Sequence, residues 1–295
     1  MIHPLAPSPL CNSGGHFHVA VADNFDPDRH DPTGMYCSRK LNGVRCLIHL
    51  RRTEEPIYYT KTGRRITGLD RVTEALAECY HTLPDKELVI DGELSLTTPD
   101  GSDDFNTLVS VIQKHNHTIE RPKFHAFDLT TVDAFAAGRW DRKYIDRRLY
   151  LDLLTQDADP EFFTLHPQER INNRAHLESN IARAVQMGWE GLVLRNNAPY
   201  SGQITEDLLR LKLWQDTEVP IVGFLADANG ISSLQVTLFG RSLQFTRDQL
   251  PPGSLDPFHQ APGLLLNSQA TLAWDAGKSI SNVRVAAIYA GGRKF

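Results

Sequence analysis

A lysine beside a predicted turn is the first residue in this chain that could do covalent chemistry. Lys40 stands at the end of a predicted strand and is followed by Asn42, Gly43 and Arg45. A lysine amine acts as a nucleophile only after it loses its proton, so it must be desolvated or face other cations. The Lys-x-Asn-Gly pattern is short, and an exposed hairpin lysine is the alternative interpretation.

Carboxylates in two apolar segments could hold a metal ion or a polar ligand. In ELVIDGELSL, strand alternation places Asp91 and Glu93 on one face, opposite Leu88, Ile90 and Leu94. Two carboxylates on a largely buried strand must be paired, hydrated or metal-bound, although a solvated strand face is the alternative. Glu190 opens a further apolar strand, WEGLVLRN, and this segment taken alone favours a capped strand edge.

Cations and an aromatic ring complete the set of candidate residues. Arg210 and Lys212 share one face of the segment LLRLKLW, about 6–7 Å apart at the rise of a strand. Neighbouring cations repel, so an anion such as phosphate commonly holds them, whereas an amphipathic strand with a solvated face is the alternative. Phe127 ends the predicted strand KFHAFDL, where a ring stacks on a base or joins the core.

The elements that position these residues are predicted from hydrophobic periodicity. Met35–Leu50 is predicted to form a hairpin turning at Asn42-Gly43, and a further strand ends at Thr60. Helical spacing is predicted over 69–83, from Asp103 or Asp104 to His115, and over 144–154 and 176–187. Strands are predicted at 87–96, 123–129, 189–196 and 207–214.

Helical periodicity nearly disappears after Trp214, which indicates a second domain. Five short strands separated by Gly, Pro, Asn or Asp predict a small all-β barrel of the OB type. We therefore expect a mixed α/β domain, rich in antiparallel strands, over 1–215 and an OB-fold domain over 216–295. Residues 1–35 are predicted to form an irregular lead-in.

Composition excludes several classes of protein. The 295 residues carry a net charge of −5 and include 41% hydrophobic and 23% charged residues, as expected for a globular protein. No apolar stretch approaches the length of a membrane span, and no secretory signal is visible, so we expect no membrane and a cytoplasmic location. Four scattered cysteines without CxxC spacing predict reduced thiols, and the histidine pairs 16/18 and 115/117 lack companion metal ligands.

In order, the segments KLNGVR, DGEL, FDL, EGLVLR and LRLKL resemble the five nucleotidyltransferase motifs of ATP-dependent DNA ligases. This superfamily also includes RNA ligases and mRNA capping enzymes. The lead-in to Lys40 and the segment TKTGRRI resemble those of minimal two-domain viral and bacterial ligases. The resemblance covers residues 20–215 well and the remainder in outline, and it implies a nucleotidyltransferase domain followed by an OB domain.

The resemblance also implies a role for each motif residue. Lys40 is similar to the lysine that attacks ATP and becomes adenylated, and Arg45 to a contact of the nucleotide and the nick phosphate. Phe127 and Val193 are similar to the residues on either side of adenine. Glu93 resembles a ribose and metal ligand, and Glu190 a metal-organising carboxylate. Arg210 and Lys212 resemble the basic pair that binds the phosphates of ATP. The resemblance assigns DNA binding to Arg45, Lys61, Arg64 and Arg65.

A three-step reaction follows from the resemblance: adenylation of Lys40, transfer of AMP to a 5′-phosphate, and attack by a 3′-hydroxyl. It requires ATP, Mg²⁺ or Mn²⁺ and nicked double-stranded DNA, with a monomer and no protein partner expected. Asn42 replaces the usual Asp, and only Arg293-Lys294 faintly substitutes for a C-terminal Arg-x-Asp-Lys element. The missing C-terminal element disfavours a capping enzyme, whereas Asn42 keeps an RNA ligase of the same superfamily as one alternative. A catalytically inactive nucleic-acid-binding relative is the other alternative.

Overall fold

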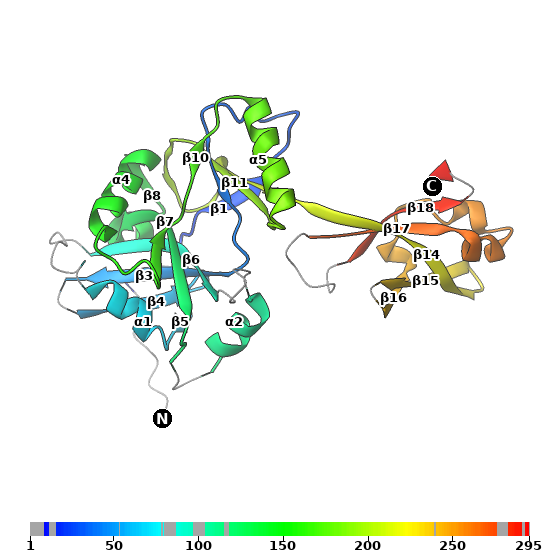
Figure 1. Ribbon diagram of the computed structural model, residues 1–295, viewed down its shortest axis with the longest axis horizontal. Coiled ribbons are helices and arrows are strands. Elements are labelled where there is room, and N and C mark those ends of the chain that lie inside the picture. The colour runs from blue at the N-terminus through cyan, green and yellow to red at the C-terminus, as the bar shows by residue number, and fades with distance from the viewer. Residues whose placement is uncertain are drawn as a thin grey trace. The chain divides into compact units, whose positions relative to one another are not determined.

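The chain divides into two compact units, Met1–Leu211 and Lys212–Phe295, and each is described here by itself. The computed structural model describes residues 9–11, 16–52, 54–77, 79, 87–96, 104–114, 118–238, 240–275, 283–290 and 293–294. Strands predominate over helices in both units, which makes the molecule a mixed α/β protein (Figure 1).

Two large sheets and one two-stranded sheet build the described part of the first unit. The five-stranded sheet has the order β1-β13-β11-β2-β10. Its strands are β1 (Val21–Asn24), β2 (Tyr36–Arg39), β10 (Glu169–Arg170), β11 (Gly191–Arg195) and β13 (Ile204–Lys212). The six-stranded sheet has the order β5-β4-β3-β6-β7-β9. Its strands are β3 (Val44–Arg51), β4 (Glu54–Thr60), β5 (Arg65–Ile66), β6 (Leu88–Leu96), β7 (Pro122–Thr131) and β9 (Phe163–Leu165).

Helices α1 (Asp70–Ala75), α2 (Phe105–Ile112) and α4 (Tyr144–Thr155) cover one face of the six-stranded sheet, whereas α5 (Arg174–Gln186) packs against β11 of the five-stranded sheet. A further helix is α3 (Val132–Ala137), and β8 (Arg139–Lys143) pairs with β12 (Pro199–Ser201). Apolar side chains of α1, α2 and α4 share one buried core with Ile48, Ile90 and Phe124. The opposite face carries Leu47 and Val89, which pack in another core with Phe135 of α3, and it also carries the polar residues Asp91 and Glu93.

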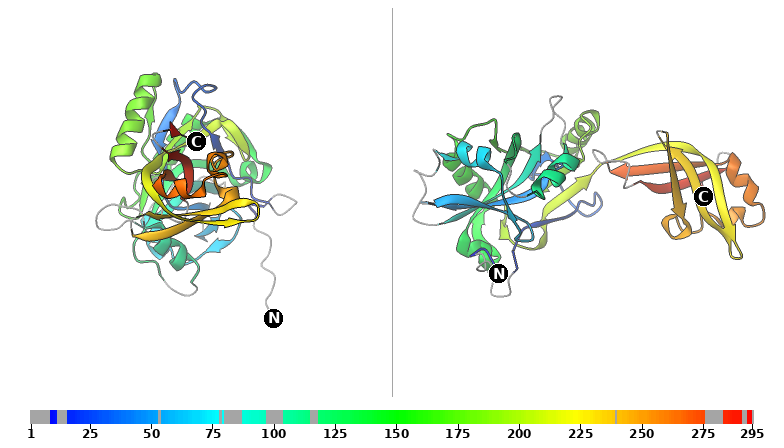
Figure 2. Two further views of the ribbon diagram at one scale, coloured as in Figure 1. Left: turned by 90° about the vertical axis from the view of Figure 1, so that its right-hand side faces the viewer. Right: turned by 90° about the horizontal axis from the view of Figure 1, so that it is seen from below.

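The second unit contains a six-stranded sheet of order β16-β15-β14-β17-β18-β19. Its strands are β14 (Trp214–Asp227), β15 (Gly230–Leu238), β16 (Arg241–Thr246), β17 (Gln269–Asp275), β18 (Arg284–Ala290) and β19 (Arg293–Lys294). The first half of β14 pairs with β17 and the second half with β15, so one long strand joins two pairings. The short helices η3 (Asp256–Phe258) and η4 (Pro262–Asn267) lie at one end of the strands (Figure 2), after η2 (Arg247–Gln249).

The predicted hairpin at Asn42-Gly43 is wrong. Strands β2 and β3 lie in different sheets, and the segment between them crosses from one sheet to the other. Gly43 does not adopt a positive φ. A Cβ at this position would instead collide with the Leu94 carbonyl oxygen and with Glu93 Cγ, at 2.8 Å from the latter. Close approach to β6, rather than a tight turn, is thus the reason for this glycine.

Two further differences concern helices. The helix predicted over 69–83 ends at Ala75 as α1, while residues 80–83 of that prediction lie outside the described residues. The sequence analysis did not predict α3, although Thr131 caps its first turn and Gly138 ends it with φ 70°. No helix among the described residues is both long and apolar enough to cross a membrane.

Candidate active site

Lys40 lies directly beside a buried carboxylate. It follows β2, and its backbone N–H donates to the carbonyl of Gly191 in β11 at 2.8 Å. Its Nζ lies 2.6 Å from Oε1 of Glu190, whose side chain is only 2% exposed. Since β2 and β11 are neighbours in the five-stranded sheet, the strand pairing itself brings these two predicted residues together.

Arg45 is held from two directions. Its Nε and Nη2 donate to the two carboxylate oxygens of Asp91, each at 2.5 Å. Its guanidinium lies 4.7 Å from the centre of the Phe127 ring, within the range of a cation–π contact. Asp91 and Glu93 lie two residues apart on β6, and Leu88, Ile90 and Leu94 belong to the core behind them, so the predicted alternation is confirmed.

Glu93 lies opposite Arg45 in the pairing of β3 with β6. Burial raises the pKa of Glu93 to about 7, and the carboxylates of Asp91 and Glu190 act in the same direction. Arg45 and Lys40 lower the pKa of Glu93 but do not outweigh burial. Glu93 therefore sits among two cations and two further carboxylates, an arrangement that responds strongly to any added charge.

Phe127 lies at an irregularity of the sheet. Asp91 pairs with Asp128, and Gly92 pairs with Ala126, which leaves Phe127 as the extra residue of a β-bulge. Asp128 is buried and forms ion pairs with Arg147 and Arg195. Burial by itself would raise the pKa of Asp128, but the two arginines hold that pKa below its usual range.

These residues surround one cavity of about 510 Å³ that lies within the first unit. Its walls come from both sheets. The predicted site residues that line it are Lys40, Arg45, Lys61, Glu93, Phe127, Val193 and Arg210. Polar and charged groups thus converge on a space large enough for a mononucleotide-sized ligand.

The other predicted residues lie elsewhere. Arg64 and Arg65 are exposed in and just after the turn between β4 and β5, close in sequence to Lys61. Lys212 is the last residue of β13 and the first of the second unit.

Arg210, which lines the cavity, donates from Nε to Oδ1 of Asn24 at 2.9 Å, and this hydrogen bond holds the arginine against β1.

The sequence analysis missed several cavity residues. Residues 17 and 19–22 form part of one wall, although this segment was predicted to be irregular lead-in. Tyr144, Arg148, His166 and Gln168 also line the cavity. None of these residues belongs to a motif with a recognisable spacing, so only the pairing of β1 with β13 and the packing of α4 bring them to the site.

A divalent cation fits the carboxylates present. Among the described residues, no group of three or more His, Cys, Asp or Glu could hold a metal ion by itself. Mg²⁺, however, usually binds one or two carboxylates and completes its coordination with water and substrate phosphates. Glu93 and Glu190 provide two carboxylates near Lys40, and their mutual repulsion is what a cation would relieve.

The comparison with protein families decides the affiliation of this chain. The model for the ATP dependent DNA ligase domain matches residues 21–212, which include the first four motif segments and all of the fifth except its last residue, Leu213. The chain belongs to the ATP-dependent DNA ligase family. That stretch of the ligase chain also contains every residue of the cavity except Phe17 and Val19 and Ala20.

Individual relatives are distant. The DNA ligase of African swine fever virus (isolate Pig/Kenya/KEN-50/1950) is 23% identical over 222 residues, which are 73% of this chain and 49% of the viral protein. The solved structure Pmar-Lig_PreS3 has a TM-score of 0.67 at 18% identity and covers 90% of this chain and 65% of its own. A structure from a study of Lig E DNA ligases has a TM-score of 0.60 at 19% identity over 90% of this chain and 98% of its own. This ligase-family chain thus spans about half the length of the viral relative, and the structures share its fold.

Proposed function

We propose that this chain is an ATP-dependent DNA ligase that seals nicks between 3′-hydroxyl and 5′-phosphate ends. The observation that supports it most strongly is the meeting of Lys40 with Glu190 at 2.6 Å beside a cavity that Glu93, Arg45 and Phe127 also line. A nucleophile, two carboxylates, cations and an aromatic ring are the groups that adenylation requires.

Different residues bind different parts of ATP in the first step, the adenylation of Lys40. Nζ of Lys40 forms a bond to the α-phosphorus of ATP, the bond to pyrophosphate breaks, and the amine loses a proton. Phe127 and Val193 hold the adenine between them, and Glu93 binds the ribose. Arg45 and Arg210 bind phosphate oxygens, where positive charge is most effective in a site shielded from water. We assign the same role to Lys212 from its place in the motif, although it does not line the cavity. Mg²⁺ or Mn²⁺, held by Glu93 and Glu190, would supply further positive charge for the phosphates.

In the later steps, AMP passes to the 5′-phosphate of the nick, and the 3′-hydroxyl then displaces AMP. We assign DNA contacts to Arg45, Lys61, Arg64 and Arg65. The side chains of Lys61, Arg64 and Arg65 are exposed, which suits phosphate binding. The chain acts as a monomer in the cytoplasm on nicked double-stranded DNA.

The two units correspond to two functional domains in this proposal. Met1–Leu211 is the nucleotidyltransferase domain and Lys212–Phe295 the OB-fold domain. Support for the second assignment comes from the strand pairings, since a long strand such as β14 that pairs with different neighbours along its length is how small barrels turn a corner. Two ligase structures resemble this chain over 90% of its length, and this similarity supports the same assignment.

Incubation with radiolabelled ATP and Mg²⁺ tests the first step. We expect a covalent, labelled protein that forms with the wild type, disappears with a chelator and is absent from Lys40→Ala. The exposed lysine variant Lys114→Ala is the matched control. Label on Lys40→Ala would refute the assignment of the nucleophile, and no label on the wild type would indicate an inactive relative.

Comparison of two nicked substrates tests the substrate. The proposal expects sealing of nicked duplex DNA to be faster than sealing of nicked duplex RNA, and to weaken as salt rises. Faster sealing of RNA would make the chain an RNA ligase of the same superfamily.

A further inference from the structure

A second cavity, of about 560 Å³, lies beside the first one. The two cavities share the lining residues Ser38, Arg39, Leu41, His166 and Gln168. Arg39 and Leu41 flank Lys40, so both spaces border the segment that carries the predicted nucleophile. Nothing in the proposed adenylation chemistry uses this second cavity.

Strand β7 connects the two cavities. Lys123, His125 and Phe127 alternate with the buried residues Phe124 and Ala126, so the first three share one face of the strand. Phe127 lines the first cavity, whereas His125 and Lys123 line the second. At about 3.3 Å per residue, Lys123 lies roughly 13 Å along the strand from Phe127. A ligand of the second cavity would therefore bind near, but not in, the predicted nucleotide site.

The lining of the second cavity is cationic and aromatic. Arg39, Lys123 and Arg183 contribute positive charge, and Glu169 already forms an ion pair with Arg183. In the part of the chain that the structure describes, no carboxylate lies within ion-pair distance of Lys123. Trp189 lies 5.7 Å from the guanidinium of Arg39. These groups favour an anion attached to an apolar or flat moiety.

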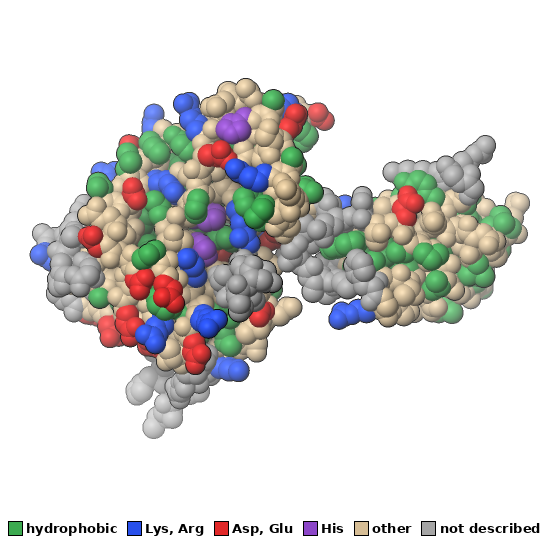
Figure 3. All heavy atoms as spheres, viewed as in Figure 1, with side chains coloured by type: hydrophobic (Ala, Val, Ile, Leu, Met, Phe, Trp, Pro, Cys, Tyr) green, Lys and Arg blue, Asp and Glu red, His purple; other side chains and the backbone are tan. Residues whose placement is uncertain are grey.

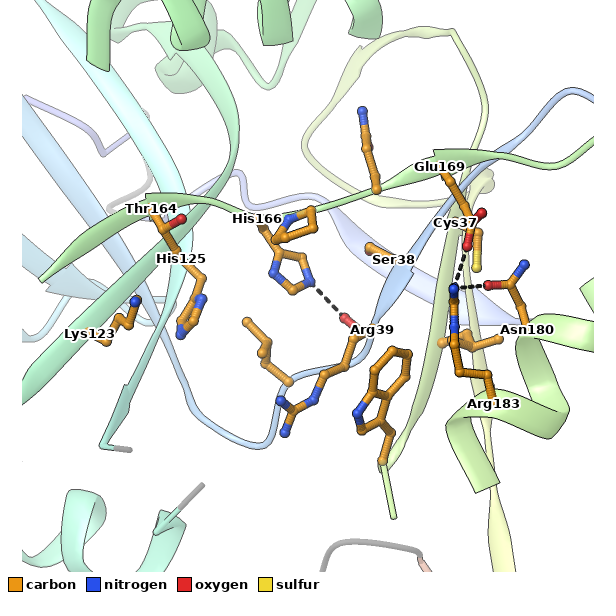
Figure 4. A pocket seen from close by; sticks show the side chains of 15 residues that line it. Cys37, Ser38, Arg39, Lys123, His125, Thr164, His166, Glu169, Asn180 and Arg183 are labelled. Carbon is orange, nitrogen blue, oxygen red and sulfur yellow. Dashed lines mark hydrogen bonds and ion pairs between the residues drawn. The ribbon is translucent and has the colours of Figure 1, made fainter. Parts of the chain in front are cut away.

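Figure 4 shows how these groups are arranged. Lys123 and His125 project from one side, Arg183 and Asn180 from the other, and Arg39 and His166 lie between them. Nε2 of His166 donates to the carbonyl of Arg39 at 2.8 Å, which fixes the backbone next to Lys40. On the face drawn in Figure 3, Lys, Arg and His side chains lie near one another on the first unit.

We propose that the second cavity is a docking site for one backbone phosphate of the nucleic-acid substrate, held by Lys123 and Arg39 with its sugar against Trp189. This inference rests on the proposed function. The proposed contacts to DNA then include Lys123, Arg39 and Trp189 in addition to the basic residues Lys61, Arg64 and Arg65 near the β4–β5 turn. The substrate would be held on both sides of the segment that carries Lys40.

The salt dependence of DNA binding tests the phosphate contact. Each phosphate contact contributes about 0.9 to the slope of log K against log[salt]. We expect Lys123→Gln to weaken binding of nicked duplex DNA about 10-fold at low salt and to reduce the slope by about 0.9, since a charge-assisted hydrogen bond is lost. Lys123→Arg retains the charge and should keep both the affinity and the slope.

Two controls separate this inference from its alternatives. Lys114→Gln removes an exposed lysine outside the cavity and should leave affinity and slope unchanged. Formation of lysyl-AMP from ATP should be equal in the wild type and Lys123→Gln, because Lys123 lies outside the first cavity.

The outcomes are distinct. If Lys123→Gln keeps the wild-type slope, or if Lys123→Arg loses as much affinity as Lys123→Gln, the cavity does not bind a phosphate of DNA. If the substitution instead weakens ATP binding, the occupant is a free nucleotide and the proposal is wrong. If the wild type neither forms lysyl-AMP nor binds nicked DNA, the proposed function fails rather than the docking site alone.

Discussion

Nζ of Lys40 and Oε1 of Glu190 lie 2.6 Å apart, although the two residues are separated by 150 positions in the sequence. The lysine side chain is 23% exposed, whereas that of the glutamate is 2% exposed. Because the carboxylate is buried and the lysine is partly exposed, we expect Glu190 to set the position of the Lys40 amine. Glu190 would then position the proposed nucleophile.

We therefore expect Glu190→Gln to slow the formation of lysyl-AMP by a factor on the order of 10² or more. The substitution keeps the size of the side chain and removes the charge that holds Nζ. Single-turnover labelling with ATP measures the rate, with Glu178→Gln on the exposed side of α5 as the control. An unchanged rate in Glu190→Gln would mean that the ion pair has no part in the reaction.

Gly43→Ala should lower activity by displacing Glu93. The added Cβ would meet Glu93 Cγ at 2.8 Å and the backbone of β6, which cannot move away cheaply. Gly263→Ala places its Cβ in open space and serves as the control. The measurement is the KM for ATP in lysyl-AMP formation together with the melting temperature. A wild-type KM and rate in Gly43→Ala would contradict the close approach.

Arg147→Met should destabilise the first unit. Arg147 is 2% exposed and donates to both carboxylate oxygens of Asp128, at 2.8 and 2.9 Å. Removal of one member of a buried ion pair costs about 3–5 kcal/mol, here reduced by the remaining Arg195. Arg139→Met breaks an exposed pair with Asp141 and should leave the stability nearly unchanged. Urea titration compares the two, and equal losses would refute the prediction.

Stability should fall as the pH drops below about 6.5, the ordinary pKa of histidine. Burial lowers the pKa values of His49 and His166 in the folded protein. The unfolded chain therefore binds protons first, and acid favours unfolding by up to about 1.4 kcal/mol per pH unit for each histidine. Melting temperatures between pH 5 and 8 measure the effect.

For His49, the neighbours Glu87 and Glu54 oppose the effect of burial, while Arg51 adds to it. His49→Gln should accordingly flatten the acidic limb of the stability curve. His259→Gln, at a half-exposed histidine, should not. A curve for His49→Gln that matches the wild type would show that this histidine does not titrate on unfolding.

The strands that contain the candidate site residues were predicted better from the sequence than the way in which these strands pair into sheets. Alternation in 87–96 placed Asp91 and Glu93 correctly on one face, because successive side chains of a strand point to opposite faces. Whether Lys40 and Arg45 belong to one hairpin or to two sheets depends on long-range pairing, which local turn signals do not contain. The contributions of His166 and of residues 19–22 to the cavity arise only from tertiary packing.

The bulge at Phe127 has a consequence for how this fold can change. Because Gly92 pairs with Ala126 and Asp91 with Asp128, deletion of Phe127 would leave β6 and β7 with an uninterrupted ladder. A single deletion would thus produce a more regular sheet, and that sheet would lack the Phe127 ring that contacts the Arg45 guanidinium. The bulge therefore interrupts the regular ladder at one position and places an aromatic side chain in the lining of the first cavity.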